Sequence, residues 1–258
     1  MKGRRSEMAQ ILDGKKVARE ILKPIKKGLA PTLAIILVGK EPKSLIYVRE
    51  KRKKAKEIGI KTLLFKFKKE AKESQIKNLI KKLNQDPKVH GILVELPLAS
   101  PLNPEAILKI IDPKKEVDGL TSRSPYPPAC ASGIMKLLSF YKIQVKDKKV
   151  VILGKGRVVG RPLSKLMKKA GAKVTLCDEE TKNLKSKTKK AEILIGATPI
   201  EDIIKPEMVK KGAVVIDASR NVREDVKKVA SYLTPKIGGV GPVTVAMLLK
   251  NLIEAAGA

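Results

Sequence analysis

The stretch Val150-Val-Ile-Leu-Gly154-Lys-Gly156-Arg-Val-Val-Gly160-Arg-Pro162 decides the fold of this chain. A short β-branched run leads into a glycine turn, and a helical segment follows the last glycine. Glycine permits positive φ angles and lets a phosphate approach the backbone N–H groups at the positive end of a helix. The spacing Gly-x-Gly-x-x-x-Gly is one residue longer than the usual dinucleotide fingerprint. The stretch therefore predicts a strand, turn and helix that bind a dinucleotide.

A second strand-like segment, Lys173–Cys177, follows at the expected distance and ends in Asp178-Glu179-Glu180. An acid at this point typically accepts hydrogen bonds from the adenosine ribose and repels a 2′-phosphate, which favours NAD. Lys155 and Arg157 favour the opposite choice, because either side chain can pair with a 2′-phosphate. The acids could also be an ordinary helix N-terminus, where carboxylates are favourable too. The residues predict NADP or NAD as the cofactor.

Short β-branched runs alternate with longer lysine-rich segments along the chain, which is typical of an α/β protein with parallel strands. The expected strands are Thr32–Val38, Lys61–Phe67, Gly91–Leu96, Lys149–Leu153, Lys173–Cys177, Ile193–Ile195 and Ala213–Ile216. The expected helices are Lys15–Lys27, Ser44–Ile58, Ser74–Asn84, Pro104–Ile111, Gly133–Phe140, Gly160–Ala170, Pro206–Lys211 and Val243–Ala255.

Two breaks interrupt this alternation. The proline-rich segment from Ser122 to Cys130 cannot be a helix interior or a central strand, so we expect it to link two domains. The second break, Thr234–Pro242, precedes the final helix. The predicted fold is α/β, with one domain of residues 1–121 and 238–258 and another of residues 122–237. We expect the second domain to be a Rossmann-like doubly wound parallel sheet, with an inter-domain cleft.

Composition argues against several classes of protein. A chain of 258 residues with 43% hydrophobic residues can fill globular cores, and no apolar run approaches the roughly 20 residues of a membrane span. Two cysteines and a single histidine, His90, provide neither a disulfide framework nor a metal-ligand spacing, so we expect no metal site. The N-terminus lacks the apolar core of a signal peptide, which predicts a cytoplasmic location.

The formal net charge of +30 suggests nucleic acid as a partner at first sight. However, the basic residues are spread along nearly every expected helix, and only three Phe and no Trp are available to stack bases. A lysine-rich surface could equally reflect a hot habitat. Nucleic-acid binding is therefore disfavoured as the main function, whereas attraction of anionic substrates is expected.

Tyr47 and Lys51 stand four residues apart in a segment without Gly or Pro. On a helix these two side chains share one face, so an aromatic ring would lie beside a primary amine. Such a face could stack a flat heterocycle and present an acid or a base to it. In a chain this rich in lysine, most lysines are nevertheless simply solvated.

Two acids and a glycine wall extend this candidate site. Glu95 stands near the C-terminal end of an apolar strand, the edge at which open α/β sheets bind ligands. Asp118 precedes Gly119, which permits a sharp turn that could aim the carboxylate. Either acid could also be a cap or a surface charge. The segment Gly238-Gly-Val-Gly-Pro242 could form a backbone wall that approaches a ligand closely.

Together these motifs resemble the bifunctional methylenetetrahydrofolate dehydrogenase/methenyltetrahydrofolate cyclohydrolase family over nearly the whole chain. Their order and spacing carry the resemblance. The matching motifs are Tyr47-Val-x-x-Lys51 with Gly59-Ile60, Gly91-Ile-Leu-Val-x-Leu-Pro-Leu98, Val117-Asp-Gly119, Gly154 with Val159-Gly160-x-Pro162, Gly212-Ala-Val-Val-Ile-Asp217, and Gly238-Gly-Val-Gly-Pro242 with Thr244.

The resemblance implies oxidation of 5,10-methylenetetrahydrofolate to its methenyl cation with NAD(P), then hydrolysis of the cation to 10-formyltetrahydrofolate, by a homodimer. It implies catalytic roles for Lys51, Glu95 and Asp118. The implied substrate-binding residues are Tyr47, Lys51, Glu95, Leu96, Pro97, Asp118, Gly238, Gly239 and Pro242. The implied cofactor-binding residues are Gly154, Lys155, Gly156, Arg157, Asp178, Glu179, Ala197, Arg220 and Thr244.

The chain departs from the family pattern at functional positions. Glu95 replaces a Gln, and its carboxylate would pair with Lys51 and hold the amine protonated. Hydration of the cation should suffer more than hydride transfer, unless Glu95 itself handles protons. Lys155-Gly156 replaces the usual Arg-Ser, and Asp178-Glu179 replaces the usual His-Ser, so the choice of cofactor stays open. The alternatives are a dehydrogenase that lacks the cyclohydrolase activity and a non-catalytic basic binding protein on the same scaffold.

Overall fold

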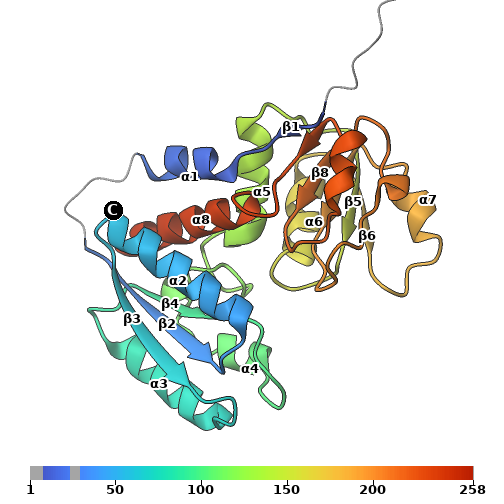
Figure 1. Cartoon of the computed structure of the whole chain (residues 1–258). Helices are drawn as coiled ribbons and strands as arrows, with labels where there is room; N and C mark the ends of the chain where they lie inside the picture. Colours follow the sequence, from blue (N-terminus) through green and yellow to red (C-terminus); the bar gives the residue numbers. More distant parts are fainter. Residues whose placement is uncertain (1–7, 24–29, 258) are drawn as a thin grey trace, which may run out of the picture. The chain divides into compact units, whose positions relative to one another are not determined.

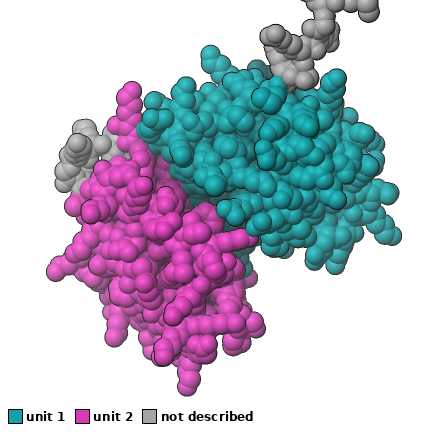
Figure 2. Space-filling view, in the orientation of Figure 1, with its two compact units in different colours: residues 1–21, 130–244 teal, residues 22–129, 245–258 magenta. Residues whose placement is uncertain are grey.

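The computed structural model describes residues 8–23 and 30–257 of the chain. The chain divides into two compact units, coloured separately in Figure 2: unit 1 comprises residues 1–21 and 130–244, and unit 2 comprises residues 22–129 and 245–258. The division differs from the expected domains because the described residues before Leu22 lie with unit 1. The ranges 1–121 with 238–258 and 122–237 stay a prediction for the functional domains.

Unit 1 is built on a six-stranded sheet with the order β1-β9-β8-β7-β5-β6, in which every pair of neighbours is parallel. Its strands are β1 (Gln10–Ile11), β5 (Lys149–Leu153), β6 (Lys173–Cys177), β7 (Ile193–Gly196), β8 (Val214–Asp217) and β9 (Tyr232–Leu233). The strands β6 and β7 flank β5 on opposite sides, so the direction of winding reverses at β5. Ligands of such sheets bind at the carboxyl ends of the strands at this reversal.

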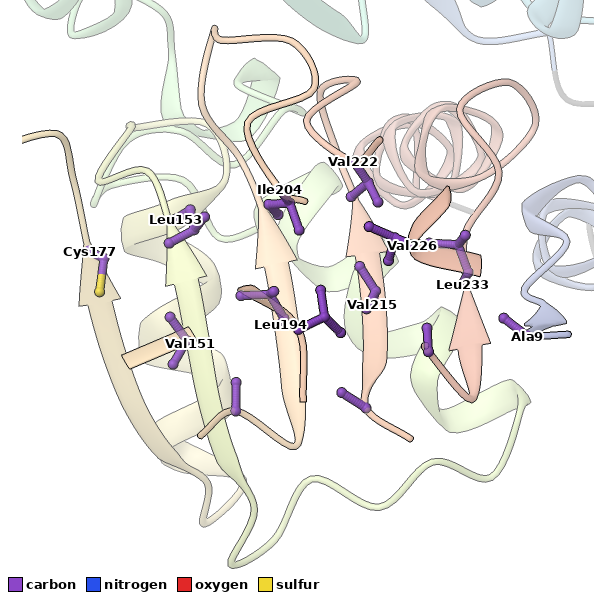
Figure 3. Close-up of a cluster of buried hydrophobic side chains, with 14 residues drawn as sticks. Ala9, Val151, Leu153, Cys177, Leu194, Ile204, Val215, Val222, Val226 and Leu233 are labelled. Carbon is purple, nitrogen blue, oxygen red and sulfur yellow. The ribbon is translucent and has the colours of Figure 1, made fainter. Parts of the chain in front are cut away.

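Alternate residues of the central strands build a core on one face of this sheet. Figure 3 shows Val151, Leu194 and Val215 on neighbouring strands, each almost fully buried. Alternation arises because successive side chains of a strand point to opposite faces. Burying one such side chain stabilises the fold by roughly 1.5–3 kcal/mol. The remaining elements assigned to this part of the chain are α1 (Gly14–Leu22), α5 (Ala129–Phe140), α6 (Gly160–Lys169), α7 (Leu184–Thr188) and the 3-10 turns η2 (Pro206–Met208) and η3 (Glu224–Lys228).

Unit 2 contains a three-stranded parallel sheet with the order β3-β2-β4. Its strands are β2 (Thr32–Val38), β3 (Lys61–Phe67) and β4 (Gly91–Val94), and its helical elements are α2 (Pro42–Glu57), α3 (Glu73–Gln85), α4 (Pro104–Leu108), η1 (Pro113–Lys115) and most of α8 (Val240–Ala255). Every residue of the central strand β2 is buried, as expected for a parallel strand covered on both faces. Figure 1 shows α2 and α3 on opposite faces of this sheet.

The structure confirms the α/β class and each of the expected strands. β2, β3, β5 and β6 have the expected bounds, whereas β4 ends at Val94 instead of Leu96, and β7 and β8 each end one residue later than expected. The helix expected at Gly133 begins at Ala129, so the proline-rich segment ends at Pro128. The helix expected over Pro206–Lys211 is only the short turn η2. The part of the first expected helix beyond Lys23 lies outside the described residues.

Five described elements were not expected: the strands β1 and β9, the helix α7 and the turns η1 and η3. β1 and β9 are two residues long and pair with each other and, in the case of β9, with β8. The helix α7 is one short turn after Asn183. Within the described ranges, no helix is both long enough and apolar enough to cross a membrane.

Asn251 of α8 ties this helix to the loop that carries Asp118. Its side-chain amide donates hydrogen bonds to the carbonyl oxygens of Val117, at 2.9 Å, and Pro127, at 3.0 Å. Asn251 and Val117 are both buried, so the carbonyl oxygen of Val117 depends on this amide rather than on water. These hydrogen bonds therefore anchor the loop around Asp118 to the C-terminal helix.

We predict that Asn251→Leu lowers the free energy of unfolding by about 2 kcal/mol, because it leaves the buried carbonyl oxygen of Val117 without its donor. Urea denaturation monitored by circular dichroism measures this change. Lys250→Leu, at the exposed neighbouring position, is the control and should change stability little. Equal stability of the two variants would contradict the anchoring role.

Candidate active site

An ion pair joins α2 to the end of β4 in unit 2. The Nζ atom of Lys51 lies 2.7 Å from Oε2 of Glu95, and the two side chains are only 12% and 5% exposed. Glu95 directly follows β4, and its N–H donates to the carbonyl oxygen of Ile36 at 2.9 Å, which fixes the backbone at the carboxyl edge of the sheet. The structure thus brings together an amine and a carboxylate that are far apart in the sequence.

Asp118 lies in the electrostatic field of the same pair. Burial raises the pKa of the Asp118 carboxyl to about 6, with the positive charge of Lys51 acting in the opposite direction and the charge of Glu95 raising it further. The following Gly119 has a φ of 71°, and a Cβ atom there would lie 2.5 Å from the carbonyl oxygen of Pro127. Only glycine fits this turn. The three predicted catalytic residues are therefore grouped within one unit.

Glu116 is a buried carboxyl group that sequence reasoning missed. Its side chain is about 1% exposed, and Oε2 accepts hydrogen bonds from the N–H of Thr121, at 3.1 Å, and from its hydroxyl, at 3.3 Å. Burial raises the pKa of Glu116 to about 7, and the nearby charge of Asp118 contributes in the same direction. Nothing in the local sequence distinguishes this acid from the many exposed ones, so its burial could not be predicted.

The other predicted folate contacts are divided between the two units. Tyr47 lies on α2 one turn before Lys51 and is 46% exposed, so its ring is open to a ligand. Leu96 and Pro97 directly follow Glu95. The predicted glycine wall, Gly238, Gly239 and Pro242, belongs to unit 1, so its contact with the folate stays a prediction.

The predicted nucleotide turn lies where the strand order of unit 1 reverses. Gly154 follows β5 with a φ of 111°, and a Cβ atom there would lie 2.2 Å from the carbonyl oxygen of Ala197, which follows β7. A Cβ atom on Gly160, the first residue of α6, would lie 1.7 Å from the carbonyl oxygen of Gly154. Gly156, by contrast, has open space around its Cα atom. The turn is compact on its inner side and open on the side where a phosphate would enter.

A second ion pair stands beside this turn. The Nζ atom of Lys155 lies 2.6 Å from Oδ2 of Asp178, the residue that follows β6. The hydroxyl of Thr181 donates to Oδ1 of Asp178 at 2.7 Å. Hydrogen bonds from Lys155 and Thr181 lower the pKa of Asp178, which is therefore ionised at neutral pH. Glu179 is exposed and Arg157 half-buried, each one or two residues from this pair.

Asn221 is a buried polar residue that the sequence analysis did not identify. Its side-chain amide donates to the carbonyl oxygens of Thr198, at 2.9 Å, and Ile200, at 2.6 Å, and so fixes the segment after β7. Its N–H donates to Oδ1 of Asp217 at 2.8 Å. The neighbouring Arg220, a predicted cofactor contact, is exposed with a φ of 63°. Asn221 thus positions the loop that adjoins Gly154 rather than touching a ligand itself.

The residues of unit 1 fit a dinucleotide. The glycine cradle leaves no room for side chains on its inner side, and the positive end of the helix α6 begins where the cradle ends, which favours a bound phosphate. Thr244 lies in the first turns of α8, where its hydroxyl donates to the carbonyl oxygen of Val240 at 3.1 Å. Among the described residues, no group of three or more His, Cys, Asp or Glu side chains could hold a metal ion. Cys130 and Cys177 are buried and form no disulfide.

The buried Glu116 makes stability depend on pH in a defined direction. Its pKa of about 7 in the fold lies above the ordinary value of 4.5, so the folded state binds more protons between these limits. The stabilisation is present at low pH and is lost as pH rises through 7. We predict that Glu116→Gln, which keeps an oxygen acceptor for Thr121, removes this loss.

The difference in unfolding free energy between the Glu116→Gln variant and the original chain should grow by on the order of 3 kcal/mol from pH 4 to pH 8. Urea denaturation across that range measures it. Glu70→Gln, at an exposed position, serves as the control and should give a nearly constant difference. A pH-independent difference for both variants would show that Glu116 does not titrate in this range.

Comparison with known proteins agrees with this geometry. The catalytic-domain model of tetrahydrofolate dehydrogenase/cyclohydrolase matches residues 12–118, and the NAD(P)-binding-domain model of the same family matches residues 128–258. The chain is 42% identical over 276 aligned positions to the "Bifunctional protein FolD" of Thermodesulfovibrio yellowstonii, with 96% of each chain covered.

Solved structures give the same result. The FolD methylenetetrahydrofolate dehydrogenase/cyclohydrolase of Campylobacter jejuni has a TM-score of 0.89 and 36% identity, with 96% of this chain and 99% of that chain covered. The Trypanosoma brucei enzyme, solved with NADP and an inhibitor, has a TM-score of 0.89 and 31% identity, with 96% and 97% covered. The chain therefore belongs to the tetrahydrofolate dehydrogenase/cyclohydrolase family, as its motifs predicted, and carries both the catalytic and the NAD(P)-binding domain.

Proposed function

We propose that this protein catalyses both reactions of its family. It oxidises 5,10-methylenetetrahydrofolate to the methenyl cation with NAD(P) and hydrolyses the cation to 10-formyltetrahydrofolate. The observation that carries the proposal is the grouping of Lys51, Glu95 and Asp118 at the carboxyl edge of the unit 2 sheet. A buried amine with two neighbouring carboxyl groups can hold a pterin, stabilise a cation and move protons.

Each side chain has a distinct role in binding. Tyr47, exposed one helical turn from Lys51, stacks along the folate. Asp118 accepts or donates hydrogen bonds at the pterin, since its pKa of about 6 leaves both protonation states accessible near neutral pH. The proposed lining of the substrate site also includes Leu96, Pro97, Gly238, Gly239 and Pro242. The proposed cofactor contacts are Gly154, Lys155, Gly156, Arg157, Asp178, Glu179, Ala197, Arg220 and Thr244.

Hydride transfer requires charge stabilisation rather than a base. The bound nicotinamide accepts the hydride, and the one-carbon bridge of the folate becomes positively charged without losing a proton. The ionised Glu95, buried at the edge of the sheet, favours that positive charge more than the neutral Gln of the family pattern would. The substitution therefore supports the oxidation step.

Hydration of the cation has a different requirement. The attacking water must lose a proton, and N5 of the folate must gain one when the ring opens. The Nζ atom of Lys51 donates a hydrogen bond to Oε2 of Glu95 at 2.7 Å, so the amine is engaged by a charged partner. While this contact lasts, Lys51 is not free to take the proton of the attacking water. This ion pair is also the observation that favours the alternative, a dehydrogenase with weak cyclohydrolase activity.

A spectrophotometric assay with methylenetetrahydrofolate and each nicotinamide cofactor separates the possibilities. Appearance of the methenyl cation followed by its decay supports both activities, whereas accumulation supports the dehydrogenase alone. Absence of reaction with both cofactors, together with salt-sensitive RNA binding, would instead support the non-catalytic basic binding protein.

We also propose that the enzyme is a cytoplasmic homodimer. The resemblance to the family supports the dimer, and Leu45 and Ile46 on α2 expose apolar surface, at 40% and 48%, that a partner could cover. Sedimentation velocity tests the oligomeric state, and fractionation of cells tests the location.

We predict that Lys51→Met lowers the rate of hydration of the methenyl cation by at least about 100-fold, because the proton donor is lost. The decay of methenyl absorbance measures this rate. The matched control is Lys54→Met, which removes another α2 lysine from an ion pair, that with Glu57 on the protein surface. Unchanged hydration in a folded Lys51→Met variant would refute the role of this amine.

We predict that Glu95→Gln raises the rate of hydration by about tenfold, because loss of the charged partner frees the amine of Lys51 to act as a base. The same absorbance assay measures it, with Glu57→Gln as the control carboxylate. A fall in rate would mean that the carboxylate of Glu95 takes part in proton transfer itself.

A further inference from the structure

The choice between NAD and NADP is set at the carboxyl ends of β5 and β6. Leu153 and Cys177 are partners in the register of these strands, and the N–H of Gly154 donates to the carbonyl oxygen of Cys177 at 2.7 Å. The residues that follow, Lys155 and Asp178, are therefore side by side. In dinucleotide-binding sheets this place faces the ribose of the adenosine half. One relative binds NADP, so the family fold alone does not decide the choice.

Asp178 is held in one position by two donors. Oδ2 contacts Lys155 and Oδ1 accepts the hydroxyl of Thr181, while the N–H of Asp178 donates back to the Thr181 oxygen at 2.9 Å. The side chain remains 26% exposed, so a ligand can reach it. Each carboxylate oxygen has two acceptor sites, and one is taken on each oxygen. Capacity remains for the two hydroxyls of a ribose.

A 2′-phosphate would bind less favourably than a ribose hydroxyl beside Lys155 and Asp178. Lys155, the nearest cation, already neutralises Asp178. Moving Lys155 to a phosphate would leave the ionised Asp178 uncompensated beside a dianion, with Glu179 and Glu180 following it in the chain. Leaving Lys155 in place would set the phosphate beside a pair without net positive charge, in which the carboxylate of Asp178 still repels it. Both arrangements are less favourable than a ribose hydroxyl.

We propose that Asp178, fixed by Lys155 and Thr181, makes this enzyme select NAD over NADP. The inference rests on the proposed function and concerns the same nucleotide site. Lys155 acts here as a positioning residue for the carboxylate, not as a contact for a 2′-phosphate. The variants Asp178→Asn and Lys155→Met change the two partners of this ion pair one at a time.

The experiment measures dissociation constants of NADH and NADPH by their fluorescence with the full-length protein, without folate. Competition by 5′-AMP and by 2′,5′-ADP isolates the adenosine half. The original chain should bind NADH at least about tenfold more tightly than NADPH. Asp178→Asn should shift this ratio at least about tenfold toward NADPH, and Lys155→Met should shift it further toward NADH, because an unpaired carboxylate repels the phosphate more strongly.

The matched controls are Asp202→Asn and Lys236→Met. These residues form another ion pair in unit 1, with the same N–O distance of 2.6 Å and similar exposure. Both controls should leave the ratio unchanged. Equal or tighter binding of NADPH by the original chain, a ratio unaltered by Asp178→Asn, or a shift of the ratio toward NADPH in Lys155→Met would each overturn the proposal.

Oxidation of methylenetetrahydrofolate by the same preparations distinguishes failure of this inference from failure of the proposed function. Turnover with an unselective binding site would refute the role of Asp178 and leave the activity intact. Selective binding of NADH without turnover would refute the activity and leave the selectivity intact. Binding of neither cofactor would overturn both.

Discussion

Parallel pairing of strands is the constraint on which both candidate sites depend. Every pair of neighbouring strands in the two sheets is parallel, so the carboxyl ends of each sheet collect at one edge. In unit 2 that edge carries Glu95, and in unit 1 it carries Gly154 and Asp178. In unit 2 the strand β2, and in unit 1 the strand β5, is flanked on opposite sides by strands that come later in the chain, which opens a crevice between the connections. The candidate functional side chains lie there because the strand order alone forms this crevice, whichever side chains the strand ends carry.

The ion pair of Lys51 and Glu95 shows how one substitution couples two reactions. Removing two charges from water is costly, and the pair offsets that cost only because the partners are in direct contact. The carboxylate in this contact stabilises the positive charge that develops on the folate during hydride transfer. The same contact keeps the amine of Lys51 engaged, although hydration of the cation would use that amine in its free form. Glu95 therefore cannot be judged as a simple gain or loss of activity. We propose that it changes the relative rates of the two reactions at one site.

Elements that depend on their own residues could be predicted from the sequence, whereas features that depend on contacts between distant segments could not. β2, β3, β5 and β6 could be bounded from the sequence, because each is a β-branched run between turn residues. β1 and β9 could not, since two-residue strands exist only through pairing between segments more than 200 positions apart. Likewise Lys51 and Asp118 were identified from motifs, but their grouping with Glu95 required the fold. The buried Glu116 and Asn221 were missed, because burial leaves no mark on the neighbouring residues.

Because the chain has many more basic than acidic residues, the acidic member of an ion pair indicates more about function than the basic member does. With 56 basic and 26 acidic residues, almost any acid will find a lysine nearby, so Lys51 and Lys155 alone would say little. The acids are the rarer charge, and two of them stand at strand ends where the family pattern has Gln and His. Each substitution adds a negative charge at a functional position and ties up a lysine there. We propose that surplus positive charge attracts anionic folates and nucleotides from a distance and that Glu95 and Asp178 govern their interactions at close range. On this proposal, the selectivity of the protein depends on the positions of its few carboxylates.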